Sequence, residues 1–410
     1  MTALLSELAR PDVWEKYYGH KDSGIGSPSA LRELRQFIDD REYMEACREI
    51  ADALDGTSPF PLPRRAVISK MSTQKKRTVY IYPRRETVTL KLLTYLVLRK
   101  YDHIFADNLY SFRPARSAHD AVDRIVDHIS RLDGRFYSYK VDVSNYFNSI
   151  DTDLLLPELE KILSDDPVLF DFLKLLLCET RVISDGEEVL ESKGIMAGTP
   201  IACFYANVFL KDLDFYFAGE GIPYARYSDD IVVLAKTSEE LEGYETYIKD
   251  YLALRGLTVN PAKEVRTEPG EALTFLGFAM DGRTIDIAPA TITKLKGKMR
   301  RKARALVRWA SRNDIEPANA AKAFIRIFNR KLLDVSDDRD LTWSRWFFSV
   351  INTDRSLHVI DRYAQDTIRY VASNTRKKSR YNIRYEDLKN WGYRSLVNEY
   401  YNFGKDGKDT

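Results

Sequence analysis

The chain has 410 residues, of which 44% are hydrophobic and 30% charged, so it can bury the cores of two or three domains and keep a soluble surface. Its apolar runs are too short to cross a membrane, and its net charge of +2 does not by itself indicate a nucleic-acid partner. The N-terminus lacks the pattern of a secretory signal, and the three cysteines are too far apart for a zinc site, so we expect a cytoplasmic protein.

The first 65 residues are predicted to form a helical extension. Apolar side chains around Trp14 and Leu34 recur at helical spacing, and a break at 24–28 separates the two runs. The proline-rich residues 58–63 end this region as an extended connector, because proline fixes φ and disfavours helix.

A β-hairpin with a basic rim is predicted next, over residues 66–83. Two basic clusters, residues 75–77 and 84–85, lie at or beside it and would suit a phosphate backbone. An amphipathic helix over 87–105 follows, and then a basic, aromatic loop at 110–117.

An alternating strand over residues 136–143 places Asp142 near its C-terminal end. After it we expect the following elements, in chain order: a helix from about 152, a helix over 167–178, a hairpin over 181–190, a glycine-punctuated loop at 194–200 and a buried helix over 201–217.

Two adjacent carboxylates, Asp229 and Asp230, lie between two apolar, β-branched runs. This pattern predicts a β-hairpin with the acidic pair at or near its turn. Aspartate is common in solvated turns, so the motif alone does not establish a metal site. Two like charges held together nevertheless suit a divalent cation with oxygen ligands.

The rest of the chain changes from mixed to helical character. A helix is expected over 239–254, a short strand and turn over 257–263, and a hairpin over 273–287; residues 288–410 are helical. Basic residues without intervening acids lie on the first of these last helices and suggest either a solvated face or a phosphate-binding face: Lys294, Lys296, Lys298, Arg300, Arg301, Lys302, Arg304 and Arg308.

Asp142 makes the acidic pair chemically meaningful. Carboxylates at the ends of different strands can meet in one antiparallel sheet, and three of them can bind two Mg²⁺ ions about 3.5–4 Å apart. Such a centre activates a 3′-hydroxyl and stabilises the leaving pyrophosphate, so the sequence indicates nucleotidyl transfer.

The order of the motifs resembles that of reverse transcriptases. The matching segments are KKR at 75–77 with IYP at 81–83, YSFRP at 110–114 with HDA at 119–121, KVDVSNYF at 140–147, residues 194–207, YSDD at 227–230, NPAK at 260–263 and FLGF at 275–278. The resemblance implies an α+β right-hand polymerase, with fingers at 66–135, a palm at 136–287 containing a helical insertion at about 152–180, and an all-helical thumb at 288–410.

The same resemblance implies metal ligands and a proton donor. Asp142 and Asp229 correspond to the main ligands of two Mg²⁺ ions, with Mn²⁺ as an alternative ion. Asp230 completes the acidic cluster, and the carbonyl of Val143 corresponds to a ligand of the second metal. Lys263 matches a lysine proposed to protonate the leaving pyrophosphate, and a surface lysine is the alternative interpretation.

For the nucleotide, the resemblance implies that Arg77, assisted by Lys76, binds the triphosphate, and that Phe147 admits only deoxyribose. The template loop contains Ala197 and Gly198 where relatives have Gln-Gly, which puts fidelity or ordinary templating in question. The residues expected to contact nucleic acid are Arg113, Phe275, Gly277, Lys298, Arg301 and Arg304.

A Gly-Thr-Pro loop, the YSDD signature, the short length and the helical C-terminus resemble bacterial defence-associated reverse transcriptases, which are related to retron and group II intron enzymes. The implied partners are a non-coding RNA template, a cDNA product and dNTPs; the oligomeric state stays open, including a homo-oligomer. Three alternatives remain: template-independent or protein-primed DNA synthesis, an inert RNA-binding scaffold, and an RNA-dependent RNA polymerase.

Overall fold

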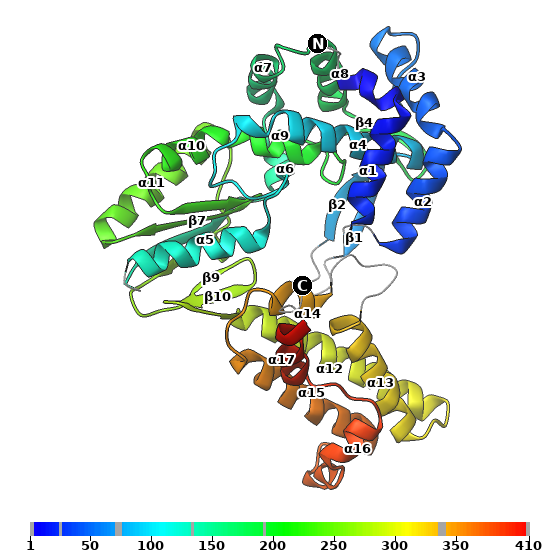
Figure 1. Ribbon diagram of the computed structural model, residues 1–410, viewed down its shortest axis with the longest axis vertical. Coiled ribbons are helices and arrows are strands. Elements are labelled where there is room, and N and C mark those ends of the chain that lie inside the picture. The colour runs from blue at the N-terminus through cyan, green and yellow to red at the C-terminus, as the bar shows by residue number, and fades with distance from the viewer. Residues whose placement is uncertain are drawn as a thin grey trace. The chain divides into compact units, whose positions relative to one another are not determined.

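The computed structural model describes residues 4–23, 27–69, 76–132, 135–191, 194–334 and 342–406; for residues 69, 76 and 404–406 it describes the backbone alone. The chain forms two compact units, Met1–Glu271 and Ala272–Thr410. Figure 1 labels the elements of each unit. Within the described ranges, no helix has both the length and the apolar character that a membrane crossing requires.

The N-terminal extension is helical, as predicted, and has an aromatic centre. Trp14 is fully buried, and its ring lies 5.1 Å from that of Phe37 and 5.5 Å from that of Tyr43. These rings come from three successive helices and hold them together. The elements are η1 (Leu4–Ala9), α1 (Pro11–Asp22), α2 (Pro28–Asp39) and α3 (Glu42–Leu54).

Helix α4 (Arg84–Lys100) begins three residues before the predicted helix and ends five residues before its predicted end, at a short 3-10 turn, η2 (Asp102–Ile104). Arg84 at its start donates to Glu33 (3.0 Å) and Glu42 (2.7 Å). Arg85 pairs with Glu45 at 2.5 Å. The basic cluster at 84–85 is therefore neutralised by α2 and α3, which corrects the expectation of a phosphate-binding cluster.

A mixed sheet joins the two hairpins predicted at 66–83 and 181–190. Its strands are β1 (Arg64–Ser69), β2 (Lys76–Ile81), β4 (Arg181–Ser184) and β5 (Glu187–Leu190), in the order β2-β1-β4-β5. Strands β1 and β4 run parallel and meet at Arg64 and Ile183, where the Ile183 N–H donates to the Pro63 carbonyl (3.0 Å). The turn predicted at 72–74 lies outside the described residues.

The central sheet of the first unit is antiparallel. Its strands are β3 (Tyr137–Asp142), β6 (Tyr224–Tyr227), β7 (Asp230–Ala235) and β8 (Val265–Thr267), in the order β6-β7-β3-β8. Helices α10 (Lys211–Gly219) and α11 (Ser238–Leu254) pack against it (Figure 1). The ring of Phe217 on α10 stacks on Tyr224 of β6 at 4.5 Å. The predicted strand ending near Asp142 and the acidic hairpin are both confirmed.

The buried helix predicted over 201–217 is two helices, α9 (Ala202–Phe209) and α10, separated at Leu210. Asp212 and Asp214 lie in the first turn of α10, where negative charge favours a new helix N-terminus. The remaining elements of the first unit are α5 (Ala118–Arg131), α6 (Tyr146–Ser149), α7 (Thr152–Ile162), α8 (Pro167–Cys178) and η3 (Pro261–Lys263).

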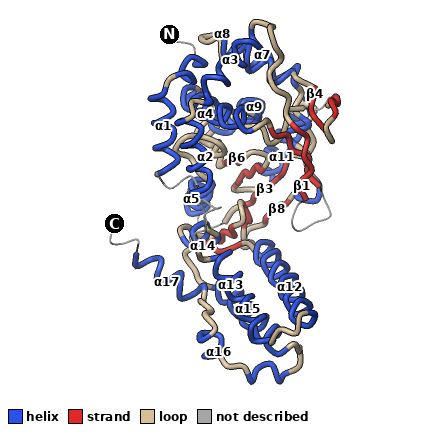
Figure 2. The backbone as a smooth tube through the Cα atoms, turned by 90° about the vertical axis from the view of Figure 1, so that its right-hand side faces the viewer, coloured by secondary structure: helices blue, strands red, loops and turns tan. Residues whose placement is uncertain are grey.

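The second unit combines a small sheet with helices. The sheet is antiparallel, β11 (Thr284–Ile287), β10 (Phe278–Asp281), β9 (Leu273–Phe275), and the helices are α12 (Pro289–Arg312), α13 (Pro317–Leu332), α14 (Trp343–Phe348), α15 (Arg355–Ser373), η4 (Lys378–Asn382), α16 (Tyr385–Asn390) and α17 (Leu396–Asp406). Helices α12, α13 and α15 pack side by side (Figure 2). Residues 273–287, predicted as part of the palm, fall in this unit because Phe278 packs on Phe347 of α14 (5.1 Å).

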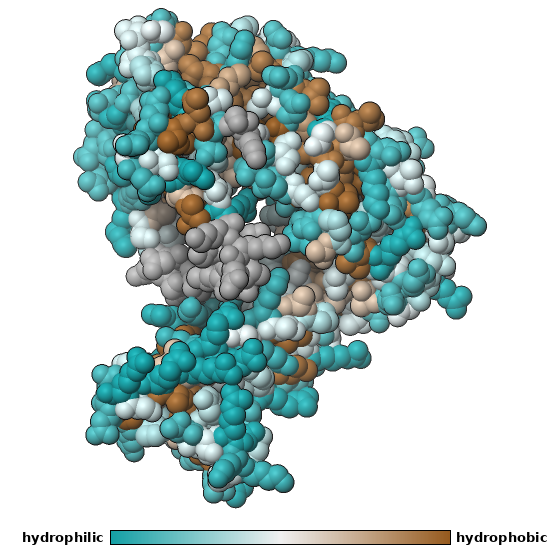
Figure 3. All heavy atoms as spheres, turned by 180° about the vertical axis from the view of Figure 1, so that it is seen from behind, coloured by the Kyte–Doolittle hydropathy of each residue, from teal (hydrophilic) through white to brown (hydrophobic). Residues whose placement is uncertain are grey.

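The face of the second unit seen in Figure 3 is mostly hydrophilic. On α12, Met299, Ala303, Leu306 and Ala310 are buried at helical spacing. Lys298, Arg301 and Arg304 are exposed on the same helix. The apolar residues thus form the packing face of α12, and the predicted nucleic-acid residues point to solvent.

Candidate active site

Asp142 and Asp230 lie directly opposite each other on neighbouring strands. The register pairs Asp142 of β3 with Asp230 of β7, and Asp230 in turn with Tyr227 of β6. Opposite residues in an antiparallel pair point to the same face, and neighbours along a strand point to opposite faces. Both carboxylates therefore lie on the face opposite to Arg226, whose side chain contacts α10.

Asp229 is in the turn of the hairpin. Strand β6 ends at Tyr227 and β7 begins at Asp230, so Ser228 and Asp229 form the connection. Ser228 has φ +61°, a left-handed conformation that is costly for a residue with a Cβ. The Val143 N–H donates to the Asp229 carbonyl at 3.0 Å. The turn is thereby tied to the residue that follows Asp142.

The carboxylates of Asp142 and Asp229 interact electrostatically. Burial raises the pKa of Asp229, the Asp142 carboxylate raises it further, and the positive charges of Lys263 and Arg77 oppose the rise. Burial also raises the pKa of Asp230, opposed chiefly by Lys140. The charges of Asp142 and Asp229 thus repel each other across the Val143–Asp229 hydrogen bond, and the charge of Lys140 favours the ionised form of Asp230.

The residues present fit a divalent cation whose coordination is completed by substrate. In the part of the chain that the structure describes, no three His, Cys, Asp or Glu residues are grouped so that protein side chains alone could hold a metal ion. Mg²⁺, however, is commonly bound by one or two carboxylates together with substrate phosphates and water. The Asp142–Asp229 pair supplies such a donor set, and their mutual repulsion favours a cation between them.

Lys263 contacts the most buried carboxylate of the site. Asp142 is 5% exposed, and its Oδ2 accepts a hydrogen bond from Nζ of Lys263, whose side chain is 52% exposed. The Asn260 N–H donates to the Asp142 carbonyl at 2.8 Å. The NPAK segment therefore lies at the end of β3, and its lysine is within reach of the predicted chemistry.

Phe147 is held by the glycine-punctuated loop. It lies on α6, five residues after Asp142, and its carbonyl accepts from the Ile195 N–H at 2.8 Å. Gly194 has φ +55°, and a Cβ there would lie 2.4 Å from the Phe147 carbonyl oxygen. Only glycine allows this approach, so the loop fixes the backbone of the predicted sugar gate.

The same loop reaches strand β2. The Tyr80 N–H donates to the Ala197 carbonyl at 2.8 Å, and a Cβ on Gly198 would lie 3.1 Å from the Val79 Cβ. Arg77, on the same strand, is exposed, and its charge acts on Asp229. The loop thus joins the backbone of Phe147 to strand β2. The side chain of Lys76 lies outside the described residues, so its role stays a prediction.

Two predicted nucleic-acid contacts are corrected. Arg113 is 8% exposed, and its guanidinium donates to the Asp102 carboxylate (2.7 and 3.0 Å) and to the carbonyls of Asp102, Ala106 and Leu109. These bonds use all its N–H groups, so Arg113 stabilises its own loop. Phe275 is fully buried in the second unit, so its ring is not available to a primer.

Gly277 has a left-handed backbone conformation, which favours glycine at this turn. It has φ +93°, and its carbonyl accepts from the Ala288 N–H at 2.9 Å. Its predicted contact with nucleic acid, like those of the exposed Lys298, Arg301 and Arg304, stays a prediction.

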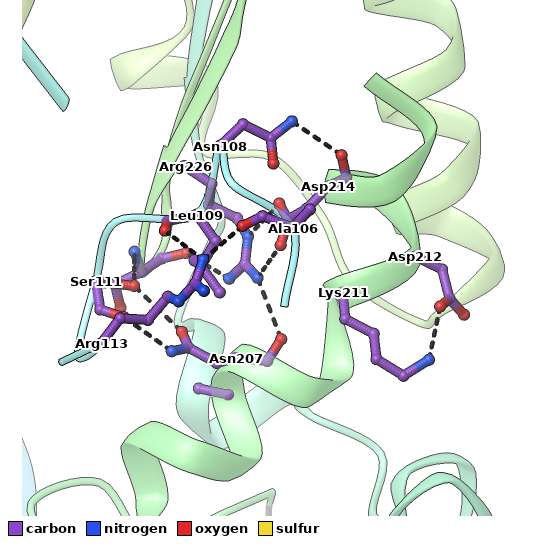
Figure 4. A network of polar contacts seen from close by, with 12 residues as sticks. Ala106, Asn108, Leu109, Ser111, Arg113, Asn207, Lys211, Asp212, Asp214 and Arg226 are labelled. Carbon is purple, nitrogen blue, oxygen red and sulfur yellow. Dashed lines mark hydrogen bonds and ion pairs between the residues drawn. The ribbon is translucent and has the colours of Figure 1, made fainter. Parts of the chain in front are cut away.

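A buried polar network behind the acidic turn was not predicted (Figure 4). Arg226 and Asp214 are both fully buried and form a bidentate ion pair, Nε–Oδ1 2.8 Å and Nη2–Oδ2 2.5 Å. Ser111 and Asn207 exchange hydrogen bonds beside them. A basic residue inside an otherwise apolar strand was the available signal, since a charge there must find a buried partner.

An antiparallel four-stranded sheet with paired carboxylates at the end of β3 and at the β6–β7 turn defines the palm of a nucleic-acid polymerase of the right-hand class. The model of the family described as reverse transcriptase (RNA-dependent DNA polymerase) matches residues 68–280. The chain belongs to this family, which confirms the resemblance at that level.

The curated relatives are similar in the same region. The group II intron-encoded protein LtrA of Lactococcus lactis subsp. cremoris is 23% identical over 217 residues, which are 52% of this chain and 35% of that protein. The protein of the same name from strain MG1363 gives the same values. The match thus spans about a third of the length of these relatives.

Solved telomerase structures are also similar. Apo telomerase from Candida Tropicalis, truncated from the C-terminal domain, has a TM-score of 0.46 and 11% identity, covering 55% of each chain. Telomerase from Candida albicans in complex with a TWJ fragment of telomeric RNA has a TM-score of 0.45 and 11% identity, covering 81% of this chain and 62% of that one.

Proposed function

We propose that this chain is an RNA-directed DNA polymerase that makes cDNA from dNTPs. The observation that carries the proposal is geometric: the β3–β7 register and the Val143–Asp229 hydrogen bond bring Asp142 and Asp229 to one end of the central sheet, where Lys263 donates to Asp142. The charge of Arg77 also acts on Asp229. A paired acidic site flanked by cations suits a nucleoside triphosphate, and Asp142 and Asp229 would hold the metal ions that stabilise charge on its phosphates.

In this proposal Asp142 and Asp229 hold two Mg²⁺ ions, for which Mn²⁺ is an alternative. Asp230 and the Val143 carbonyl are further ligands. When bound, the ions lower the pKa of the attacking 3′-hydroxyl and stabilise charge on the leaving pyrophosphate. The chain's own contribution is to hold the two carboxylates at fixed positions, through the β3–β7 register and the Val143–Asp229 hydrogen bond.

The other residues bind and orient the substrate. Arg77, with help from Lys76, binds the triphosphate, because a guanidinium forms two parallel hydrogen bonds to phosphate oxygens. Phe147 excludes a 2′-hydroxyl by occupying its space. Ala197 and Gly198 shape the loop beside the incoming base. Lys263 delivers a proton to the leaving pyrophosphate.

The template is proposed to be a dedicated non-coding RNA in a cytoplasmic anti-phage defence system. The support is the sequence resemblance: a Gly-Thr-Pro loop, the YSDD signature and a helical C-terminal region. Nucleic acid is proposed to contact Gly277 and the exposed residues Lys298, Arg301 and Arg304 of α12. A homo-oligomer is one of the assemblies compatible with this role.

Primer extension on an RNA template with dNTPs and Mg²⁺ tests the activity. We expect incorporation by the wild type and a loss of at least about a thousandfold in Asp229→Asn with Asp230→Asn, because the substitution keeps the shape and removes the charge. Asp250→Asn, an exposed aspartate on α11, is the matched control and should keep full activity. Failure of the wild type to incorporate dNTPs refutes the activity.

Sequencing the RNA and DNA that co-purify with the protein tests the template. A product complementary to one bound RNA supports the proposal, whereas a random or homopolymeric product supports template-independent or protein-primed synthesis, to which the Ala197 loop would point. Phage plaque assays with the variant Asp229→Asn, Asp230→Asn test the proposed role in anti-phage defence. Full protection by that variant would instead support an RNA-binding scaffold.

A further inference from the structure

The guanidinium of Arg226 lies directly behind the acidic turn. It is fully buried, and besides its two bonds to Asp214 it donates from Nη1 to the carbonyl of Ser228 (3.3 Å) and from Nη2 to the carbonyl of Asn207 (3.2 Å). The Tyr224 hydroxyl also donates to Asp214, at 3.0 Å. Taking an ion pair out of water is costly, and an apolar pair is often at least as stable, so stability alone does not account for these charges.

The carbonyl that Arg226 holds belongs to the peptide group between Ser228 and Asp229. Because a peptide group is planar, fixing the Ser228 oxygen fixes the plane from which Asp229 extends. The other side of Ser228 is held as well, since its N–H donates to Oγ of Ser111 at 2.9 Å. Ser228 has φ +61°, a conformation that persists only where its surroundings determine it.

The contacts of this turn come from three separate segments. Ser111 belongs to the loop after η2, and it exchanges hydrogen bonds with Asn207 of α9, at 3.1 and 2.8 Å. Asp214 belongs to α10. Figure 4 shows the Asp214 carboxylate and the Asn207 backbone carbonyl at the Arg226 guanidinium, with the side chains of Ser111 and Asn207 facing each other beside it. Helix α9, which follows the glycine-punctuated loop at 194–200, and the turn that carries Asp229 therefore belong to one hydrogen-bonded network.

We propose that the buried Arg226–Asp214 pair, together with Ser111 and Asn207, positions the Asp229 carboxylate for metal binding. This inference rests on the proposed polymerase function. Arg226 and Asp214 act through the Ser228 peptide group, on the face of the sheet opposite to Asp142, so they are positioning residues that do not touch substrate.

The test replaces the pair without leaving a buried charge or hydroxyl unpaired, in the triple variant Tyr224→Phe, Asp214→Leu, Arg226→Met. We expect cooperative unfolding to be retained and kcat to fall about ten- to a hundredfold, because a small displacement of a reacting group has effects of that size. The KM for dNTP and the affinity for primer–template should stay within about twofold of wild type, since no residue that binds them is changed.

A readout independent of turnover is Mn²⁺ binding, followed by the loss of the free-ion signal in electron paramagnetic resonance. We expect the triple variant to bind Mn²⁺ several-fold more weakly and to need several-fold more Mg²⁺ for half-maximal activity. The matched control is Glu158→Leu with Arg255→Met, which removes another ion pair of the first unit (2.6 Å) and should leave both values unchanged.

Each outcome decides the question. Wild-type kcat and wild-type Mn²⁺ affinity in the folded triple variant would overturn the positioning role, while an inactive wild type would overturn the proposed function and leave Mn²⁺ binding as the test of the inference. Ser111→Ala provides a second variant if the triple variant does not fold, because it keeps the Arg226–Asp214 pair and removes only the two bonds of the Ser111 hydroxyl, from the Ser228 N–H and to Oδ1 of Asn207. It should show the same effects at about three- to tenfold, and unchanged values would count against the proposal.

Discussion

Nζ of Lys263 donates a hydrogen bond to Oδ2 of Asp142, which pairs a half-exposed lysine with the most buried carboxylate of the site. The lysine and a metal ion therefore compete for the same oxygen. A proton donor to pyrophosphate must leave this pair once a cation and a triphosphate are bound. Lys263 is thus the counter-ion of Asp142, and its proposed role as proton donor can be measured separately.

We expect Lys263→Gln to lower the Mg²⁺ concentration for half-maximal primer extension a few-fold, because the competing cation is gone. The same variant should lower kcat by about 10²-fold or more if the lysine is the general acid. Lys236→Gln, an exposed lysine after β7, is the control. A kcat near that of wild type, with only the Mg²⁺ dependence changed, would leave Lys263 a counter-ion alone.

Phe147→Ala should admit ribonucleotides. The ring lies five residues after Asp142, and in its proposed role as sugar gate its removal opens space for a 2′-hydroxyl. We expect the preference for dNTP over NTP, measured as the ratio of kcat/KM values, to fall by at least about tenfold. A wild-type enzyme that already prefers NTPs contradicts the gate and favours an RNA polymerase.

Gly194→Ala should impair nucleotide use through steric overlap with the gate. A Cβ at Gly194 (φ +55°) would lie 2.4 Å from both the Phe147 oxygen and the Asn148 carbon. Gly282→Ala is the matched control, since Gly282 has φ +57° and no atom within 4 Å of its Cβ position. We expect a loss of about tenfold or more in kcat/KM for dNTP in the first variant only. An equal loss in the two variants would mean that the strain of alanine at positive φ causes the effect, and not overlap with Phe147.

The exposed basic face of α12 should contribute to binding of nucleic acid through phosphate contacts. Replacing Lys298, Arg301 and Arg304 together by glutamine should weaken binding of an RNA–DNA duplex and reduce the slope of log K against log salt by about 2 to 3, as expected for three lost contacts. The charge-matched control replaces three exposed lysines of the first unit, Lys161, Lys174 and Lys236, by glutamine. An unchanged slope means that α12 is only a solvated face.

His128 should make the protein less stable in mild acid. Burial and the charges of Arg124 and Arg131 lower its pKa from 6.5 to about 4, with Asp127 opposing. The unfolded chain therefore binds the proton more readily, and the free energy of unfolding should fall as pH decreases from about 6.5 to 4. His128→Asn should reduce this loss, measured as Tm against pH; an identical profile would contradict the assignment.

Local patterns in the sequence were sufficient for the elements that carry the chemistry. Alternation predicted the strand that ends at Asp142, and the apolar runs flanking Asp229 and Asp230 predicted the hairpin, because strand periodicity and turn residues are local properties. The sequence did not specify which groups of a loop pair with one another. The resemblance assigned Arg113 to nucleic acid, although Asp102 and backbone carbonyls of its own loop bind it.

The amino-acid sequence by itself therefore determined where the strands lie along the chain, which acidic residues stand at their ends, and the family to which the chain belongs. Only the tertiary structure decided that Asp142 faces Asp230, that Gly194 contacts the backbone of Phe147, and that Arg226 supports the turn before Asp229. The first two relations join residues far apart in the chain, and the third depends on the pairing of Arg226 with Asp214 of α10. They depend on register, close packing and the need of a buried charge for a partner, and no local pattern specifies that partner.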